Sequence, residues 1–177
     1  MSSHYVWTLA LRLRPDAPES FLAELRFHLG LTDWLPDEPV LPYDWPCLVA
    51  ESDDALPGGG IRSLVVQQPY LEQPGSLGLL VRTLVLDDAM YELMQSVPAW
   101  LAPWSLTQGW IGDAREEFDL HTWLCFYVQS GHAYAAQPGK TIKPLSDGAP
   151  AFVLRETTDF PEPTDGAGPW SLGTRHT

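Results

Sequence analysis

Two stretches of the chain, residues 6–29 and 77–101, repeat the same order of patterns, and this repeat constrains the fold more than any other feature. Each stretch begins with an alternating run of apolar and polar residues, which is typical of a strand that covers a core with one face. Each then passes through acidic residues into apolar residues at helical spacing. The sequence therefore predicts strands over 6–14 and 77–86, and helices over 18–29 and 89–101.

The first predicted strand has one strongly apolar face. Every second residue is large and apolar, namely Tyr5, Trp7, Leu9, Leu11 and Leu13. Successive side chains of a strand point to opposite faces, so we expect these five to face the core. The helix that follows has its own boundary signals, because Asp16 and Glu19 resemble a capping box and Gly30 offers a left-handed stop.

The second predicted helix has a clear apolar stripe and one conflicting residue. Asp87 or Asp88 is the expected N-cap. Pro98 should kink the helix or end it near Val97, because proline lacks the backbone N–H that a helix interior needs. The stripe that should face the core consists of Met90, Leu93, Met94, Val97 and Leu101.

Residues 31–46 form a predicted loop, because four prolines within them forbid a continuous helix or central strand. The loop also holds several large apolar side chains, so we expect it to fold back over an apolar surface. Acidic residues are frequent from 31 to 60, where Lys and Arg are absent, and we interpret them as a solvated rim. Shorter apolar runs predict further strands over 47–51, 61–70, 105–111, 122–129, 132–136 and 151–155, with glycines 58–60 as a hairpin connection.

These elements predict one α+β domain over residues 1–155 with repeats at about 4–70 and 77–138. Each repeat has the order strand, helix, strand, strand. Two such units would form one mainly antiparallel sheet with both helices packed on one face, or two half-sheets about a pseudo-twofold axis. Residues 156–177 are rich in Pro, Thr, Asp, Gly and Ser, and we expect an irregular, mobile tail there.

The order of elements over about residues 4–138 resembles duplicated small-molecule-binding domains of the gyrase-inhibitor type. It is also similar to ferredoxin-like dimeric barrels and to the glyoxalase and bleomycin-resistance group. The resemblance concerns the order of elements alone, and no residue motif accompanies it. It implies a duplicated, barrel-like arrangement with a concave seam between the copies.

Composition excludes several classes of function. A formal net charge of -13, with 10 Lys and Arg against 23 Asp and Glu, argues against binding to a nucleic-acid backbone. The chain has no apolar run near the roughly 20 residues that span a bilayer, and no export signal at its start, so we expect no membrane association and a cytoplasmic location. Cys47 and Cys125 lack metal or redox spacing and should be buried thiols, and no motif indicates a metal or another cofactor.

Aromatic side chains give the first candidate site. The chain contains eight Trp, six Tyr and six Phe, and several fall in loops or at the ends of predicted elements. Such residues can line a cleft for a flat or apolar ligand, beside an arginine that offers a fixed polar contact. The more conservative interpretation is that they cover the sheet. The candidate set is Trp34, Tyr43, Trp45, Trp100, Trp104, Trp110, Arg62 and Arg82.

Glu117, Asp119 and His121 give the second candidate site. If this segment is extended, the three side chains share one face, as a general acid–base pair would require. A solvated turn with the same residues is the alternative. The segment therefore supports catalysis only as a secondary hypothesis.

Three functional hypotheses follow from these observations. The first is a non-catalytic domain that binds a small apolar or aromatic ligand between the repeats, or a protein partner through its aromatic loops. The second is an enzyme that uses Glu117, Asp119 and His121 in the same cleft. The third is an assembly role, in which a free face of the sheet forms a homodimer and the negative charge maintains solubility.

Overall fold

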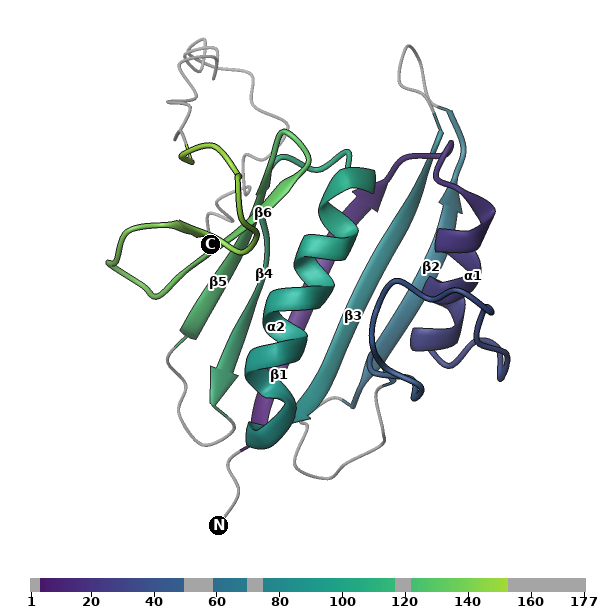
Figure 1. Ribbon diagram of the computed structural model, residues 1–177, viewed down its shortest axis with the longest axis horizontal. Helices are drawn as coiled ribbons and strands as arrows, with labels where there is room; N and C mark the ends of the chain where they lie inside the picture. The colour runs from purple at the N-terminus through teal and green to yellow at the C-terminus, as the bar shows by residue number, and fades with distance from the viewer. Residues whose placement is uncertain (1–3, 50–58, 70–74, 117–121, 153–177) are drawn as a thin grey trace, which may run out of the picture.

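The computed structural model describes residues 4–49, 59–69, 75–116 and 122–152. They form an α+β fold in which one long sheet carries two helices (Figure 1). In chain order the elements are β1 (His4–Leu13), α1 (Glu19–His28), β2 (Ile61–Gln67), β3 (Ser76–Leu86), α2 (Asp87–Leu101), the short helix η1 (Ala102–Trp104), β4 (Gly109–Glu116), β5 (Thr122–Gln129), β6 (His132–Ala136) and β7 (Lys143–Pro144).

The sheet has seven strands in the order β2-β3-β1-β4-β5-β6-β7, and every pair is antiparallel. β1 is a central strand, where Leu9 lies opposite Val81 of β3 on one side and Gly112 of β4 on the other. A Cβ atom at position 112 would collide with the backbone carbonyl oxygen of Thr8, so only glycine fits there. β3 lies between β1 and β2, and residues 4–70 and 77–138 therefore contribute to one continuous sheet.

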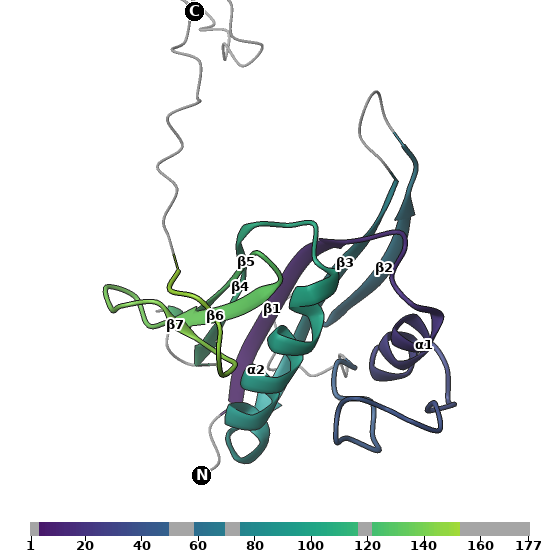
Figure 2. The same ribbon diagram turned by 45° about the horizontal axis from the view of Figure 1, so that its top comes forward.

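The predicted alternation of β1 is confirmed. Trp7, Leu9, Leu11 and Leu13 are at most 5% exposed, whereas the residues between them are only half-buried. α2 crosses this buried face (Figures 1 and 2) and contacts β1, β3 and β6. The predicted stripe is also confirmed, because each of its members is almost completely buried: Met90, Leu93, Met94, Val97 and Leu101.

α1 lies beside α2 on the same face of the sheet. The Phe21 ring is centred 4.8 Å from Trp100 of α2, and Arg62, which pairs with Val81 of β3, donates to the carbonyl oxygen of Leu29 at 3.1 Å. Phe21, Leu22 and Leu25 belong to the same hydrophobic core as the buried face of β1. The two helices and the sheet thus enclose one core.

The predicted stop of α1 is confirmed and its start lies within one residue of the prediction, but the predicted capping box does not form. Gly30 has a φ of 60°, and the N–H of Leu31 donates to the carbonyl oxygen of Arg26 at 2.8 Å, as in a Schellman motif. At the other end Pro18 occupies the cap position, and no side chain within the described residues caps the helix. Asp16 accepts from Arg14 and Glu19 accepts from Arg26, so both carboxylates have charged partners instead.

The predicted N-cap of α2 is wrong, and the helix does not end near Val97, which was one of the two alternatives predicted for Pro98. Leu86 is the cap residue, because β3 passes into α2 without a linker and places both aspartates inside the first turn. The helix also continues through Pro98 to Leu101. Val97, Pro98, Trp100 and Leu101 are all buried, so packing on both sides of the proline compensates for the missing hydrogen bond.

The loop 31–46 folds back onto α1, as predicted for its apolar residues, although only in part. Glu24 of α1 accepts hydrogen bonds from the backbone N–H groups of Val40 at 2.9 Å and Leu41 at 2.7 Å. Leu41 and Tyr43 are buried. The large apolar side chains that stay exposed, contrary to the prediction, are Trp34, Val40 and Trp45.

The shorter strands were predicted unevenly. β6 matches its prediction and β5 agrees with 122–129, but the strand expected over 105–111 begins later, at Gly109, because Ser105 forms only an isolated bridge to Leu13. Two further strands were predicted, over 47–51 and 151–155, and their described residues, 47–49 and 151–152, are not in a strand. The remaining residues of these two predicted strands lie outside the described residues. The glycine at position 58 and the tail 156–177 also lie outside them. β7 had no predicted counterpart, since two residues leave no periodicity to detect.

Candidate ligand-binding site

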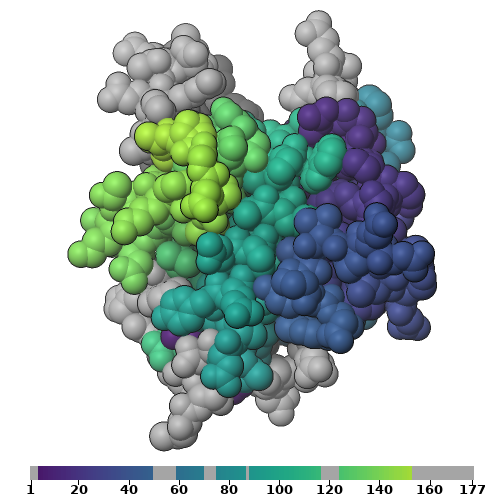
Figure 3. Space-filling model, viewed as in Figure 1, coloured from purple at the N-terminus to yellow at the C-terminus, as the bar shows by residue number. Residues whose placement is uncertain are grey.

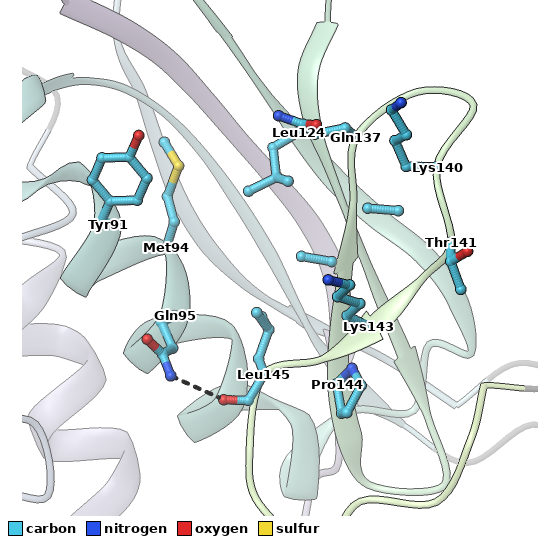
Figure 4. A pocket seen from close by; sticks show the side chains of 12 residues that line it. Tyr91, Met94, Gln95, Leu124, Gln137, Lys140, Thr141, Lys143, Pro144 and Leu145 are labelled. Atoms are coloured by element: carbon cyan, nitrogen blue, oxygen red, sulfur yellow. Dashed lines mark hydrogen bonds between the residues drawn. The ribbon is translucent and has the colours of Figure 1, made fainter.

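A cavity of about 770 Å³ lies between α2 and the end of the sheet formed by β5, β6 and β7. Figure 3 shows α2 at the surface between two segments, 132–152 on one side and 31–49 on the other. The cavity is on the 132–152 side. Figure 4 shows side chains of α2 facing side chains of the strands and of the segment 137–145 across it.

Small side chains on β6 leave the space that the cavity occupies. Ala135 and Ala136 of β6 both line the cavity, and larger residues at these positions would fill part of it. Beyond β6 the chain turns at Gly139, with a φ of 74°, and returns as β7. The segment then approaches α2, because Gln95 donates to the carbonyl oxygen of Leu145 at 3.5 Å (Figure 4). This contact closes one end of the cavity.

The lining combines an apolar wall with a polar rim. The apolar residues come from α2, the strands and the returning segment, and they are Met94, Leu124, Ala135, Ala136, Pro144 and Leu145. The polar residues lie mostly on exposed positions of α2 and of the segment 137–143, and they are Tyr91, Gln95, Gln137, Lys140, Thr141 and Lys143. An apolar interior with a few polar groups at its edge is the usual composition of a small-molecule site.

The aromatic residues predicted as a ligand site do not line this cavity. Four of them gather around α1 instead: Tyr43 and Trp45 have ring centres 5.9 Å apart, and the rings of Trp100 and Trp104 lie within 5.7 Å of Phe21. Tyr43 and Trp100 are buried, so they act as core residues, in line with the conservative interpretation. Trp34 is 58% exposed and Trp110 51% exposed, and each lies apart from this cluster.

The two predicted arginines donate hydrogen bonds to backbone carbonyl oxygens of neighbouring segments. Arg62 donates to the carbonyl oxygens of Leu29 and Gly30, both at 3.1 Å. Arg82 donates to the carbonyl oxygen of Gly59 at 2.9 Å. These bonds tie neighbouring segments to β2 and β3, so neither guanidinium lies at the cavity.

Glu117, Asp119 and His121 lie outside the described residues, and the acid–base hypothesis stays a prediction. Within the part of the chain that the structure describes, no group of three or more His, Cys, Asp or Glu side chains has an arrangement that would hold a metal ion.

One set of buried titratable groups was not predicted. The Sγ atom of Cys47 lies 3.4 Å from Nδ1 of His28, and Nε2 of His28 lies 3.8 Å from Oε1 of Glu24. Burial raises the pKa of the Cys47 thiol to about 12. Burial also lowers the pKa of His28, against the opposing effect of the nearby Glu24 carboxylate. A protonated thiol beside a neutral imidazole has no nucleophilic activation, so these residues stabilise the fold.

A second, smaller cavity of about 420 Å³ lies near this set, between the turn at 45–49 and the junction of β3 with α2. Trp45, Cys47 and Leu93 are among its lining residues. The described residues of its lining include no Lys, Arg, Asp or Glu. We therefore place the candidate site in the larger cavity, where apolar and charged groups occur together.

Sequence reasoning missed the larger cavity because its lining residues come from three separate stretches of the chain, 91–95, 124 and 135–145. One signal was available: both lysines of the chain, Lys140 and Lys143, fall within four residues of each other. In a chain with so few basic residues, two lysines this close together indicate a candidate binding segment.

Among the described helices, none is both long and apolar enough to cross a membrane. Comparisons of the chain with models of protein families, with curated proteins and with solved structures find no match.

Proposed function

We propose that the protein binds a small apolar or aromatic molecule in the cavity between α2 and strands β5 to β7. The observation that carries the proposal is a cavity of about 770 Å³ whose lining includes six apolar residues. Small-molecule sites typically measure about 300–1,000 Å³ and have this composition. The position differs from the aromatic cleft expected from the sequence, but the class of ligand is the same.

The proposal needs no rearrangement of the core. Met94, Ala135 and Ala136 are at most 8% exposed, so they form a fixed floor for a ligand. Burial of an apolar ligand against such a floor is favourable by about 25 cal/mol for each Å² removed from water. The exposed residues of 137–143 form the opposite wall, so a ligand can enter from that side.

Titration calorimetry with cinnamyl alcohol, a neutral aromatic probe, tests the proposal. We expect the wild type to bind the probe and Thr141→Trp to bind it at least fivefold more weakly, because an indole at this exposed position on the lining would occupy the mouth. Gln68→Trp is the matched control, since Gln68 is also exposed but follows β2 at the opposite edge of the sheet. Failure of the wild type to bind this probe and its charged analogues of the same shape, or equal binding by Thr141→Trp, would overturn the proposal.

The open face of the sheet supports self-association as a second candidate function. Ile61, Val65 and Leu80 are between 37% and 54% exposed on the face opposite the helices, and Leu80 pairs with Ser63 between the other two. Exposed apolar residues in a contiguous patch commonly mark an interaction surface.

Sedimentation velocity over a wide range of protein concentration tests self-association. We expect a concentration-dependent dimer in the wild type and a monomer in Val65→Lys/Leu80→Lys, since two charges would have to be buried in the interface. Thr141→Trp should dimerise like the wild type, because its substitution lies elsewhere. A wild type that stays monomeric throughout would contradict this candidate.

A further inference from the structure

The cavity wall opposite α2 carries the only two lysines in the chain, Lys140 and Lys143. Figure 4 shows both side chains on the far side of the cavity from α2. Both residues are exposed, and neither ammonium group has an ion pair or a hydrogen bond with any residue that the structure describes. Each ammonium therefore keeps its three donors for another partner.

The two lysines form a local positive group in a chain that is otherwise strongly negative. The chain has 23 Asp and Glu and a formal net charge of -13, yet none of the described residues that line the cavity is acidic. The overall charge would repel an anion in solution, so an anion would be held only where a local positive group outweighs that repulsion. The lysine pair provides such a place, next to the apolar wall.

We propose that the cavity selects an organic carboxylate whose body is apolar or aromatic. This inference rests on the proposed function, because it names the class of ligand for the same cavity. The carboxylate accepts hydrogen bonds from Lys140 and Lys143, while the body of the ligand packs against Met94, Leu124 and Ala135. Gln137 and Thr141 offer uncharged hydrogen-bonding groups on the same wall.

Three probes of matched shape test the inference: cinnamate, cinnamyl alcohol and cinnamylammonium. We expect the wild type to bind cinnamate about three- to tenfold more tightly than the alcohol, because two solvent-exposed charge pairs contribute about this much. The ammonium probe should bind most weakly of the three. In 1 M NaCl, where the Debye length is about 3 Å, the preference should largely disappear.

Two double variants identify the source of the preference. Lys140→Gln/Lys143→Gln should bind cinnamate and the alcohol equally. The control Arg14→Gln/Arg26→Gln also removes two positive charges, but from exposed ion pairs in α1 and just before it. This variant should keep the wild-type preference for cinnamate.

The outcomes separate this inference from the proposed function. If the wild type binds the alcohol as tightly as cinnamate, and Thr141→Trp weakens the binding of both, carboxylate selection is overturned. The proposal that the cavity binds a ligand would then still stand. A preference that persists in Lys140→Gln/Lys143→Gln would also overturn the inference. Failure of all three probes to bind would overturn both proposals.

Discussion

His28 is completely buried, yet it carries a group that ordinarily titrates near neutral pH. Its neighbours explain why the structure tolerates it: Cys47 lies 3.4 Å away, and the rings of Tyr43 and Trp100 contact it edge-on. Burial lowers the pKa of His28 below its ordinary value of 6.5. In the folded protein the imidazole is therefore neutral under conditions in which the unfolded chain already binds a proton.

This difference predicts a pH dependence of stability with a definite sign. As the pH falls below 6.5, the unfolded state gains a proton at position 28 and the folded state does not, so the free energy of unfolding decreases. The slope should approach about 1.4 kcal/mol per pH unit until the lowered pKa of the folded state is reached. Urea unfolding of the wild type and of His28→Gln, at a series of pH values below 6.5, measures how the free energy of unfolding changes with pH. Identical slopes in the two proteins would contradict the assignment.

The residue scale also shows what the sequence could and could not predict. Burial of Cys47 was predicted because a lone thiol behaves as a small apolar group, and the structure confirms it at 4% exposure. The roles of Arg62 and Arg82 were not predictable, since their acceptors are backbone carbonyl oxygens that only folding brings near them. Glu24 is similar, because nothing in its surroundings in the chain marks it as a buried acceptor.

At the scale of elements, Glu24 joins α1 to the loop 31–46. Its carboxylate is 2% exposed and accepts two backbone hydrogen bonds from Val40 and Leu41. Because a loop with four prolines forms few internal hydrogen bonds, this attachment largely determines where the loop lies.

Removal of this acceptor should therefore destabilise the fold. Glu24→Ala leaves two N–H groups without their acceptor near the core, and we expect a loss of about 2–4 kcal/mol in the free energy of unfolding. Glu24→Gln keeps one acceptor oxygen and should lose less. Urea denaturation of the three proteins measures the differences. A stability of Glu24→Ala close to that of the wild type would show that the loop does not depend on this contact.

Regular elements with a strong period were the most predictable. β1 and the apolar stripe of α2 follow from alternation and from helical spacing, because burial imposes those periods directly. The continuation of α2 through Pro98 was not predictable from local signals, since it depends on packing of Trp100 and Leu101 against other elements.

At the scale of the whole molecule, the candidate site arises from the end of the sheet. α2 packs closely over β1 and β3, but the small residues of β6 and the excursion between β6 and β7 leave space beside it. The α+β class and the antiparallel sheet with two helices could be inferred from the order of patterns. The cavity could not, because its walls come from segments that share no sequence motif and meet only in the folded sheet.

We propose that this cavity, rather than the aromatic cluster or the open face of the sheet, binds the ligand. Intermolecular nuclear Overhauser effects between cinnamate and methyl groups of the protein test it most directly. We expect contacts from the aromatic protons of cinnamate to the methyl groups of Met94, Leu124 and Ala135. Contacts to Val65 or Leu80 on the open face, without any to these three residues, would contradict it.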